Sequence, residues 1–257
     1  MADREQLTLG IASPPRADTA ARVYYEDEFA TLWCGDCREV LAASGRREFD
    51  LLATDPPYGI EYRSGYGDNH EPIVGDDGSL DVLAVVADAV CKLRSNRHAY
   101  VFGYKADDLS RAPNITAAAD LVWDKGAPGM GDLASLYGRS TEPIAFGVFC
   151  DSPAAARGGL AARLRRGTVL RCDIARGAIG SDHPTQKPVA LMRQIIESST
   201  LLGDLVLDPF AGAGSTLVAA VVSGRQAIGI ELEEKYCERA ARRLRAARTL
   251  RLALEAM

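Results

Sequence analysis

The sequence predicts a single α/β domain, and three stretches carry that prediction. The apolar runs Phe49–Thr54 and Asp204–Asp208 each end in a turn, as buried strands of a mostly parallel sheet do. A glycine-rich turn and an apolar helical segment follow the second run, and Gln226–Glu231 then has the pattern of a further strand. A strand, turn, helix and strand in this order form the unit from which parallel sheets are built.

The size and composition fit one domain of this kind. With 257 residues, 47% of them apolar, the chain can bury a sizeable core, and we expect no separate second domain. Residues 1–22 are polar and contain Pro14-Pro15, which predicts a flexible N-terminal arm before a domain at 23–257. No run approaches the roughly 18 apolar residues of a membrane helix, and the N-terminus lacks the order of a signal peptide. We therefore expect a cytoplasmic protein with no membrane partner.

Local apolar patterns predict the remaining elements. Six are expected: strands at Phe29–Trp33, His98–Phe102, Asp120–Trp123 and Pro143–Phe149, and helices at Leu80–Leu93 and Val189–Leu202. Pro188 is well placed to begin the second of these helices. A last helix around Arg239 to Arg251 is expected to pack on the surface through an apolar face of Leu244, Leu250, Leu252 and Leu254.

The cysteines do not predict a metal site or a disulfide framework. There are six in a chain of this length. Cys34 and Cys37 have a spacing found in metal sites, but no second pair of Cys or His follows at the distance of a zinc finger. A structural role is favoured for both thiols, and we expect no metal.

The first chemical motif is Asp55-Pro56-Pro57-Tyr58, directly after a predicted strand. Proline lacks an N–H and fixes φ, so the two prolines hold an extended backbone whose carbonyl can point at a planar amine, and Asp55 can accept a hydrogen bond from that amine. The Tyr58 ring can stack on a base, which is worth about 1–3 kcal/mol. Asp-Pro-Pro alone is equally consistent with a proline-rich turn that ends a strand.

The second motif joins a strand to a helix and reads Asp208-Pro209-Phe210-Ala211-Gly212-Ala213-Gly214-Ser215-Thr216. Small residues let a ligand approach the backbone, and the helix N-terminus offers unpaired N–H groups. Glu231 ends the next strand, where an acid can accept hydrogen bonds from ribose hydroxyls. The turn lacks Gly-x-Gly-x-x-Gly and the lysine of a phosphate loop, so the nucleoside of S-adenosylmethionine is favoured over a dinucleotide or a nucleoside triphosphate.

With four further stretches, these motifs make the chain resemble the S-adenosylmethionine-dependent amino methyltransferases of DNA, in the beta subgroup whose catalytic half precedes the cofactor half. The further stretches are Gly35-Asp36-Cys37, Leu121-Val122-Trp123-Asp124-Lys125, Glu142 and His183-Pro184-Thr185-Gln186-Lys187-Pro188. The resemblance covers about Leu32 to Leu244. It implies a Rossmann-like class I methyltransferase domain, with a mostly parallel seven-stranded sheet, helices on both faces and a circularly permuted motif order.

The resemblance also implies a role for each matching residue. Asp55, Pro56 and Pro57 bind the target amine, and Tyr58 stacks on a base flipped out of the duplex. The cofactor lies on Asp208, Phe210, Gly212, Gly214 and Ser215, with Glu231 at its ribose, Asp36 near its adenine, and Thr185 and Lys187 near its methionine end. From the residues alone, Asp36 can instead cap a helix that begins near Arg38, and His183 is expected to be an ordinary loop histidine.

The net charge of −5 opposes DNA binding, but the basic residues are unevenly distributed. Between Ser152 and Arg176, one acid, Asp173, accompanies six arginines: Arg157, Arg163, Arg165, Arg166, Arg171 and Arg176. In the resembling subgroup the segment at 151–182 recognises the target, and arginine suits both phosphates and guanine edges. We expect the first five arginines to bind DNA, with a solvated basic helix as the alternative. Residues 59–80 are glycine-rich and predict a mobile loop, either a lid over the base or a disordered segment.

The predicted activity is methyl transfer from S-adenosylmethionine to N6 of adenine in duplex DNA, by base flipping and in-line attack. The aspartate of the first motif favours adenine, because serine there is associated more with cytosine N4 in the family. One rival is a protein glutamine methyltransferase, which uses Asn-Pro-Pro-Tyr in the opposite motif order. Another is an inactive cofactor-binding partner subunit, against which Asp55 and Tyr58 argue. The sequence leaves open a homodimer, a cognate restriction nuclease and the target sequence.

Overall fold

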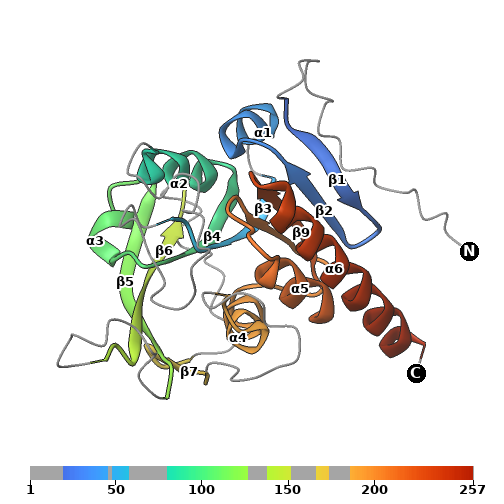
Figure 1. Ribbon diagram of the computed structural model, residues 1–257. Helices are drawn as coiled ribbons and strands as arrows, with labels where there is room; N and C mark the ends of the chain where they lie inside the picture. The colour runs from blue at the N-terminus through green and yellow to red at the C-terminus, as the bar shows by residue number, and fades with distance from the viewer. Residues whose placement is uncertain are drawn as a thin grey trace, which may run out of the picture.

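A mixed sheet runs through the centre of the molecule (Figure 1). The computed structural model describes residues 20–45, 48–57, 80–126, 138–151, 166–173 and 186–256. In these residues nine strands are hydrogen-bonded in the order β1-β2-β9-β8-β3-β4-β6-β5-β7. Their bounds are β1 Arg22–Glu26, β2 Ala30–Cys34, β3 Phe49–Thr54, β4 Leu93–Phe102, β5 Ile115–Asp124, β6 Thr141–Phe149, β7 Val169–Arg171, β8 Leu205–Asp208 and β9 Gln226–Glu231.

Most neighbouring strands are parallel, with antiparallel pairs toward the two ends of the sheet. β1 with β2, β4 with β6, and β5 with β6 are the antiparallel pairs. The expected count of seven strands is not met, because two short edge strands, β1 and β7, add to the seven between them. β1 has no fully buried residue and β7 has three residues, so neither has the apolar run that predicts a strand.

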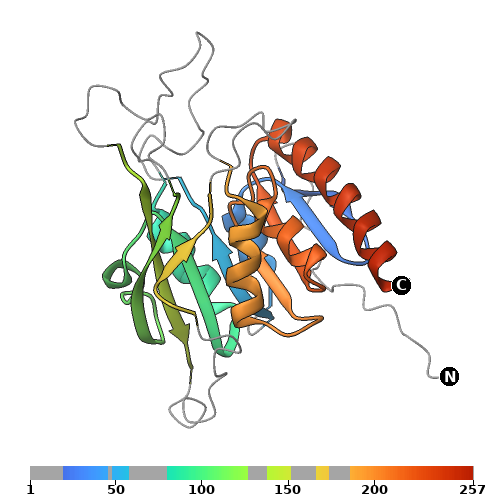
Figure 2. The ribbon, with the colours of Figure 1, turned by 90° about the horizontal axis from the view of Figure 1, so that it is seen from below.

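Helices cover both faces of the sheet, as expected. They are α1 Cys37–Ala43, α2 Val82–Cys91, α3 Ala106–Leu109, α4 Val189–Ser199, α5 Ser215–Val222 and α6 Glu234–Glu255. The last three lie side by side on one face (Figure 2), and the first three cover the other. Alternate side chains of β3 enter the two cores, Leu51 with the later helices and Leu52 with the earlier ones, so every residue of this strand is buried.

Element boundaries follow the predictions where an apolar run ends abruptly. β3 and β9 have the predicted bounds, and α2 and α4 lie inside the predicted ranges. Pro188 precedes α4 as its N-cap residue. β4 begins five residues earlier than predicted, because its polar start at Arg94 and Arg97 pairs with the buried Asp50.

The apolar face predicted for the last helix is wrong in part. α6 does pack on the surface of the domain, but it does so through Leu244 and small residues: Cys237, Ala240, Ala241 and Ala247. Leu250, Leu252 and Leu254 are exposed. The end of α6 extends past the sheet toward the C-terminus, and no core of the described residues covers these leucines there (Figure 1).

Several domain predictions fall on residues that the structure does not describe. They are most of the N-terminal arm, all of the loop at 59–80 except residue 80, and most of the segment at 151–182. The folded part begins before residue 23, because Ala21 is buried and β1 starts at Arg22.

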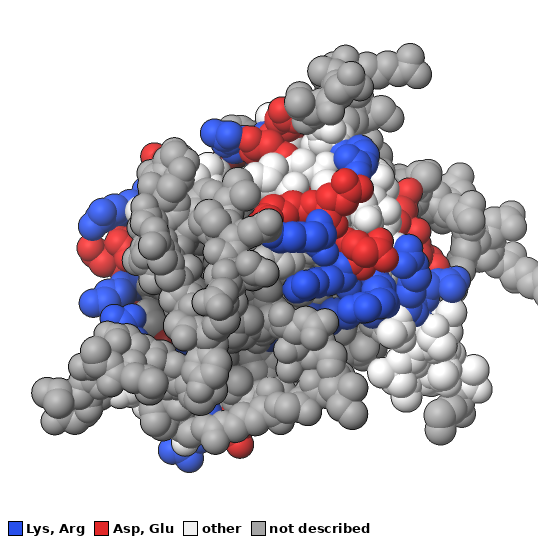
Figure 3. All heavy atoms as spheres, viewed as in Figure 1, with Lys and Arg blue, Asp and Glu red and all other residues white. Residues whose placement is uncertain are grey.

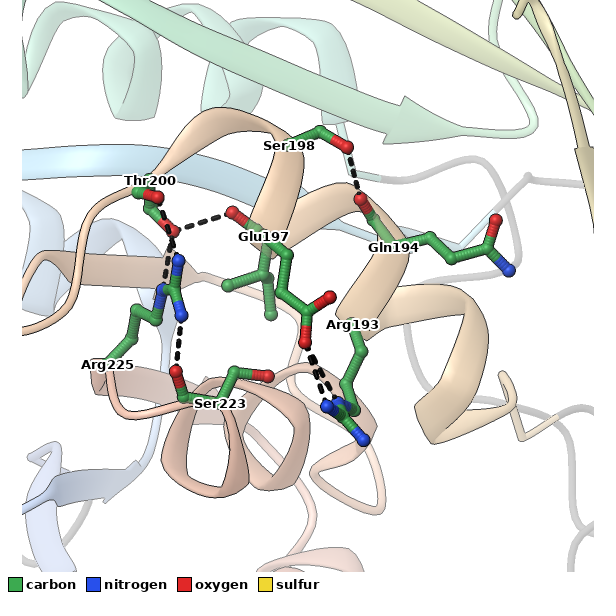
Figure 4. Close-up of polar contacts among 8 residues, drawn as sticks. Arg193, Gln194, Glu197, Ser198, Thr200, Ser223 and Arg225 are labelled. Carbon is green, nitrogen blue, oxygen red and sulfur yellow. Dashed lines mark hydrogen bonds and ion pairs between the residues drawn. The ribbon is translucent and has the colours of Figure 1, made fainter. Parts of the chain in front are cut away.

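The edge where the parallel strands begin, here called the amino edge, is held by buried polar groups. Asp50 accepts from Arg94, from Arg97 Nε at 2.9 Å and from the Leu205 backbone N–H at 3.1 Å. Below the end of α4, Arg225 donates to Thr200 Oγ1 at 2.9 Å, to the Thr200 carbonyl at 2.8 Å and to the Ser223 carbonyl (Figure 4).

Candidate active site

Three acids that are far apart in the sequence meet where parallel strands end. Asp55 follows β3, Asp208 ends β8 and Glu231 ends β9. β8 pairs in parallel with both other strands, so the three ends lie at one side of the sheet, here called the carboxyl edge. Open α/β sheets bind ligands at this edge, which makes it the candidate active site.

Asp55 is half-buried, and Pro56, the next residue in the chain, is buried. The Asp55 carboxylate accepts a hydrogen bond from Lys187 Nζ at 2.6 Å. Tyr58, the last residue of the first motif, lies outside the described residues. The part of this motif that the structure describes is therefore a carboxylate on a proline-stiffened turn, held by a lysine.

Asp208 is buried under the turn that follows β8, here called the Gly212 turn, rather than presented at its surface. Its Oδ1 accepts from Thr54 Oγ1 at 2.7 Å and from the Phe210 backbone N–H at 3.1 Å. Burial raises its pKa to about 6, although hydrogen bonds from Thr216 and Thr54 oppose the change. Asp208 thus ties the end of β3 to the turn after β8.

Two glycines of this turn have different reasons to be glycine. Both have left-handed backbone, with φ of +51° at Gly212 and +77° at Gly214. A Cβ on Gly214 would lie 2.9 Å from Ala240 Cβ, so this glycine allows α6 to approach. A Cβ on Gly212 would meet no atom of the described residues within 4 Å, so among these residues Gly212 faces open space at the carboxyl edge.

Glu231 is hydrogen-bonded to the backbone of Gly212. Its two carboxylate oxygens accept from the backbone N–H groups of Gly212 and Glu233, both at 2.8 Å. Burial raises its pKa to about 7, against the effect of these two hydrogen bonds. No cation is paired with Glu231 in the described part of the chain, and each of its oxygens can accept a further hydrogen bond.

Asp36 caps α1, so the interpretation of this residue as a helix cap is confirmed. Its carboxylate accepts from the Arg38 backbone N–H at 2.8 Å and from the Arg38 guanidinium. The hydrogen bond from that guanidinium holds the pKa of Asp36 low. Gly35 donates to the Glu231 carbonyl at 2.9 Å, which places the start of α1 beside the end of β9.

Lys187 lies among acids and aromatic rings. Its Nζ contacts Asp55 Oδ2 at 2.6 Å and Glu142 Oε1 at 2.9 Å. The same nitrogen is 5.2 Å from the centre of the Phe102 ring and 5.9 Å from that of Trp123. The structure therefore places Lys187 beside Asp55 of the first motif, and its place near the methionine end of a cofactor stays a prediction.

Arg243 of α6 is a contact that the sequence did not indicate. It donates to the Ala213 carbonyl and, at 3.3 Å, to Ser215 Oγ. With the Gln186 amide oriented to satisfy its neighbours, the amide oxygen accepts from Arg243 at 2.9 Å. Arg243 thus joins the Gly212 turn to the segment before α4. An arginine within a basic helix gives no sequence signal for this role.

Of the five arginines expected to bind DNA, the structure describes two. Arg171 ends β7, its side chain is 85% exposed, and it lies 3.6 Å from Asp124 at the carboxyl edge. Arg166 precedes the same strand, and its Nε donates to Ser198 near the end of α4 at 2.7 Å. Arg157, Arg163 and Arg165 lie outside the described residues, as does Thr185.

Lys and Arg side chains also gather along the course of α6, with acidic side chains beside them (Figure 3). Arg248 pairs with Glu28 and Arg251 with Glu255, both at 2.9 Å.

In the described part of the chain, no helix is both long and apolar enough to cross a membrane. The same residues contain no cluster of three His, Cys, Asp or Glu side chains placed to hold a metal ion.

The proteins and the family model that the chain resembles are all named as methylases or methyltransferases. The family model for DNA methylase, of the N6/N4 methyltransferase type, matches residues 165–242, which include the Gly212 turn and Glu231. The chain is 27% identical over 254 residues to the DNA adenine methyltransferase YhdJ of Escherichia coli K12, covering 86% of this chain and 84% of that one. It is 26% identical over 248 residues to the type II methyltransferase M2.DpnII of Streptococcus pneumoniae, covering 87% and 92%.

Solved structures show that the fold is methyltransferase-like. The complex of M1.HpyAVI with S-adenosylmethionine has a TM-score of 0.62 and 23% identity, covering 84% of this chain and 98% of that one. The cytosine-N4-specific PvuII DNA methyltransferase has a TM-score of 0.61 and 16% identity, covering 87% and 91%.

Proposed function

We propose that this chain is an S-adenosylmethionine-dependent DNA methyltransferase that methylates N6 of adenine in duplex DNA. The observation that carries the proposal is the meeting, at one edge of the sheet, of the Asp55 turn with the Gly212 turn and Glu231. One turn suits a planar amine and the other a nucleoside, and methyl transfer requires both at one place. A relative named as a DNA adenine methyltransferase matches most of the chain, which favours adenine over cytosine N4.

The residues present fit S-adenosylmethionine. Gly212 borders open space, and Glu231 has capacity to accept from ribose hydroxyls. Phe210, Gly214 and Ser215 would complete the walls of this site, with Asp36 near the adenine. Asp208 would act from below by holding the turn. The permuted beta subgroup and a homodimer are part of the same proposal.

S-adenosylmethionine supplies an electrophilic methyl group when bound. The target amine is a weak nucleophile because its lone pair is delocalised into the base. Asp55 would accept a hydrogen bond from the amine and orient that lone pair, while Pro56 and Pro57 keep the turn extended. Alignment is the main contribution that this arrangement can make, with reacting atoms held about 3–3.5 Å apart.

DNA would approach the carboxyl edge, with the target base flipped into the site. Stacking on Tyr58 would offset part of the few kcal/mol needed to extrude a base. Arg171 is exposed at this edge and suits a phosphate or a guanine, and Arg157, Arg163 and Arg165 belong to the same proposed segment. A cognate restriction nuclease is proposed because several relatives are named type II methyltransferases.

Transfer of labelled methyl groups tests the proposal. The purified chain would be incubated with methyl-labelled cofactor and, separately, with mixed-sequence duplex DNA or with protein extract. We expect label in DNA, and none in DNA incubated with Asp55→Ala. Label in protein would favour a protein methyltransferase, and cofactor binding without label in either would favour an inactive partner subunit. Both of these results contradict the proposal.

A further inference from the structure

Four charged side chains of alternating sign form a row that ends on Asp55. Lys125 Nζ lies 2.9 Å from Glu142 Oε2, and Glu142 Oε1 lies 2.9 Å from Lys187 Nζ. Lys187 Nζ in turn lies 2.6 Å from Asp55 Oδ2. This charge row, Lys125-Glu142-Lys187-Asp55, includes three residues to which the proposed function gives no role.

The members of the charge row come from four separate segments. Lys125 follows β5 and Glu142 lies near the start of β6, two antiparallel strands that pair Trp123 with Glu142. Lys187 precedes α4, and Asp55 follows β3. No two members are close in sequence, so the row exists only because the carboxyl edge brings these segments together.

Burial distinguishes the charge row from a surface ion pair. The side chain of Lys187 is 9% exposed, that of Glu142 14% and that of Asp55 30%. The Phe102 and Trp123 rings flank the ammonium group, and Trp123 is itself fixed by a 2.7 Å hydrogen bond from its Nε1 to the Cys172 carbonyl. A buried, flanked ammonium group has few alternative positions, so it holds its partner in one orientation.

The charges of the row support one another. Burial alone would lower the pKa of Lys187, but Asp55 and Glu142 outweigh it and the pKa is raised. Burial alone would raise the pKa of Glu142, but Lys187 and Lys125 outweigh it and the pKa is lowered. Each inner member thus keeps its charge because its neighbours keep theirs.

We propose that Lys187 and Glu142 are positioning residues for methyl transfer: Glu142 anchors the Lys187 ammonium group, and Lys187 fixes the Asp55 carboxylate in the orientation that receives the target amine. This inference rests on the proposed function. It differs from a role of Lys187 at the methionine end of the cofactor, because a positioning residue acts on the rate of transfer and a cofactor ligand acts on cofactor affinity.

The kinetic test compares Lys187→Met and Glu142→Gln with the wild type. For each protein, kcat is measured with duplex DNA and the Kd for S-adenosylmethionine is measured by calorimetry. Misplacing a reacting group by about 1 Å costs about 100-fold in rate, so we expect that loss of kcat in Lys187→Met with an unchanged Kd. In Glu142→Gln, where an amide replaces the anchoring carboxylate, we expect a loss of about tenfold. Methylammonium added to Lys187→Ala should restore part of the activity.

The matched control is Lys92→Met. Lys92 is as buried as Lys187, but it lies outside the carboxyl edge. Its Nζ donates to the Ser44 carbonyl at 3.3 Å. This variant should lower the melting temperature and leave kcat unchanged. A Lys187→Met protein with wild-type kcat overturns the inference, and so does one whose main defect is a Kd raised tenfold or more.

A separate readout keeps this inference distinct from the proposed function. A wild-type chain that methylates no DNA would contradict the function alone. The contacts of Lys187 with Asp55 and Glu142 are then measured through the ¹⁵N resonance of the Lys187 ammonium group, whose protons exchange slowly when buried and hydrogen-bonded. We expect that signal in the wild type and its loss in Asp55→Asn and in Glu142→Gln. Its persistence in both variants would overturn the inference.

Discussion

Asp50 at the amino edge and the pair Glu231 and Asp208 at the carboxyl edge are buried carboxylates whose pKa values shift in opposite directions. At the amino edge, burial would raise the pKa of Asp50, but Arg94, Arg97 and a backbone N–H outweigh it and the pKa is lowered. At the carboxyl edge, Glu231 and Asp208 have neutral donors, and burial raises their pKa values to about 7 and about 6. Within the described residues, Asp50 pairs with two cations, whereas Glu231 and Asp208 accept from neutral groups, and perturbed carboxylates of the second kind are typical of ligand sites.

Removing the Asp55 carboxylate should give the largest effect, and it should be an effect on catalysis. We expect Asp55→Ala to lower kcat by about 10³-fold or more, because the amine loses its acceptor. Cofactor affinity should remain measurable, because the Gly212 turn and Glu231 are intact. Asp55→Asn serves as a second variant that preserves the side-chain volume. Wild-type rates in both variants would contradict the proposed role of Asp55.

The amino edge should show the reverse pattern. Asp50→Ala leaves Arg97 largely buried without its carboxylate, which we expect to lower the free energy of unfolding by about 3 kcal/mol. Urea denaturation measures this, and kcat at a temperature where the variant is folded should be unchanged. Asp107→Ala, which removes an exposed partner of Arg111, is the control and should change stability little. Loss of kcat in folded Asp50→Ala would remove the distinction between the edges.

Cofactor affinity should depend on pH through Glu231. Its pKa of about 7 lies above the ordinary 4.5, so the folded chain holds a proton that the unfolded chain releases between these values. Raising the pH through that window therefore lowers the free energy of unfolding of the ligand-free chain. Ribose hydroxyls donate to the ionised carboxylate, so the Kd should rise about tenfold between pH 8 and pH 6. Calorimetry checks this, and a similar slope in Glu231→Gln would refute the assignment.

The smallest expected effect concerns the two described arginines of the proposed DNA segment. Arg171→Ala should weaken duplex binding by a few fold and make it less dependent on salt, because one contact to DNA is lost. Arg166→Ala should have a smaller effect, because its side chain is already bonded to Ser198. Fluorescence anisotropy at several salt concentrations measures both. Equal losses would mean that the segment moves toward DNA as a unit.

The sequence predicted the elements with strong local signals and missed those fixed by distant contacts. β3 and β9 were predicted to the residue because Asp55 follows one apolar run directly and Glu231 ends the other. The edge strand β1 was missed because its residues are mostly polar or half-exposed. The face of α6 was predicted from leucines, although the close approach of Ala240 to Gly214 favours small residues.

The candidate site was predictable as a set of motifs but not as a set of contacts. The turn at Asp55 and the turn at Gly212 could be recognised because each has unusual composition for its place after a strand. The partner of Asp55 could not, because Lys187 is distant in sequence and reaches it only through the assembled sheet. Glu142 had no local signal beyond its place in the family pattern, and its role depends on the pairing of β5 with β6.

The central claim, methylation of adenine N6, is tested most directly by mass spectrometry of nucleosides from treated DNA. Unmethylated duplex DNA would be incubated with the wild-type chain and S-adenosylmethionine, then digested to nucleosides alongside a sample treated with Asp55→Ala. We expect N6-methyldeoxyadenosine in the first sample and none in the second. N4-methyldeoxycytidine in place of the adenine product, or equal amounts of product in both samples, would contradict the account.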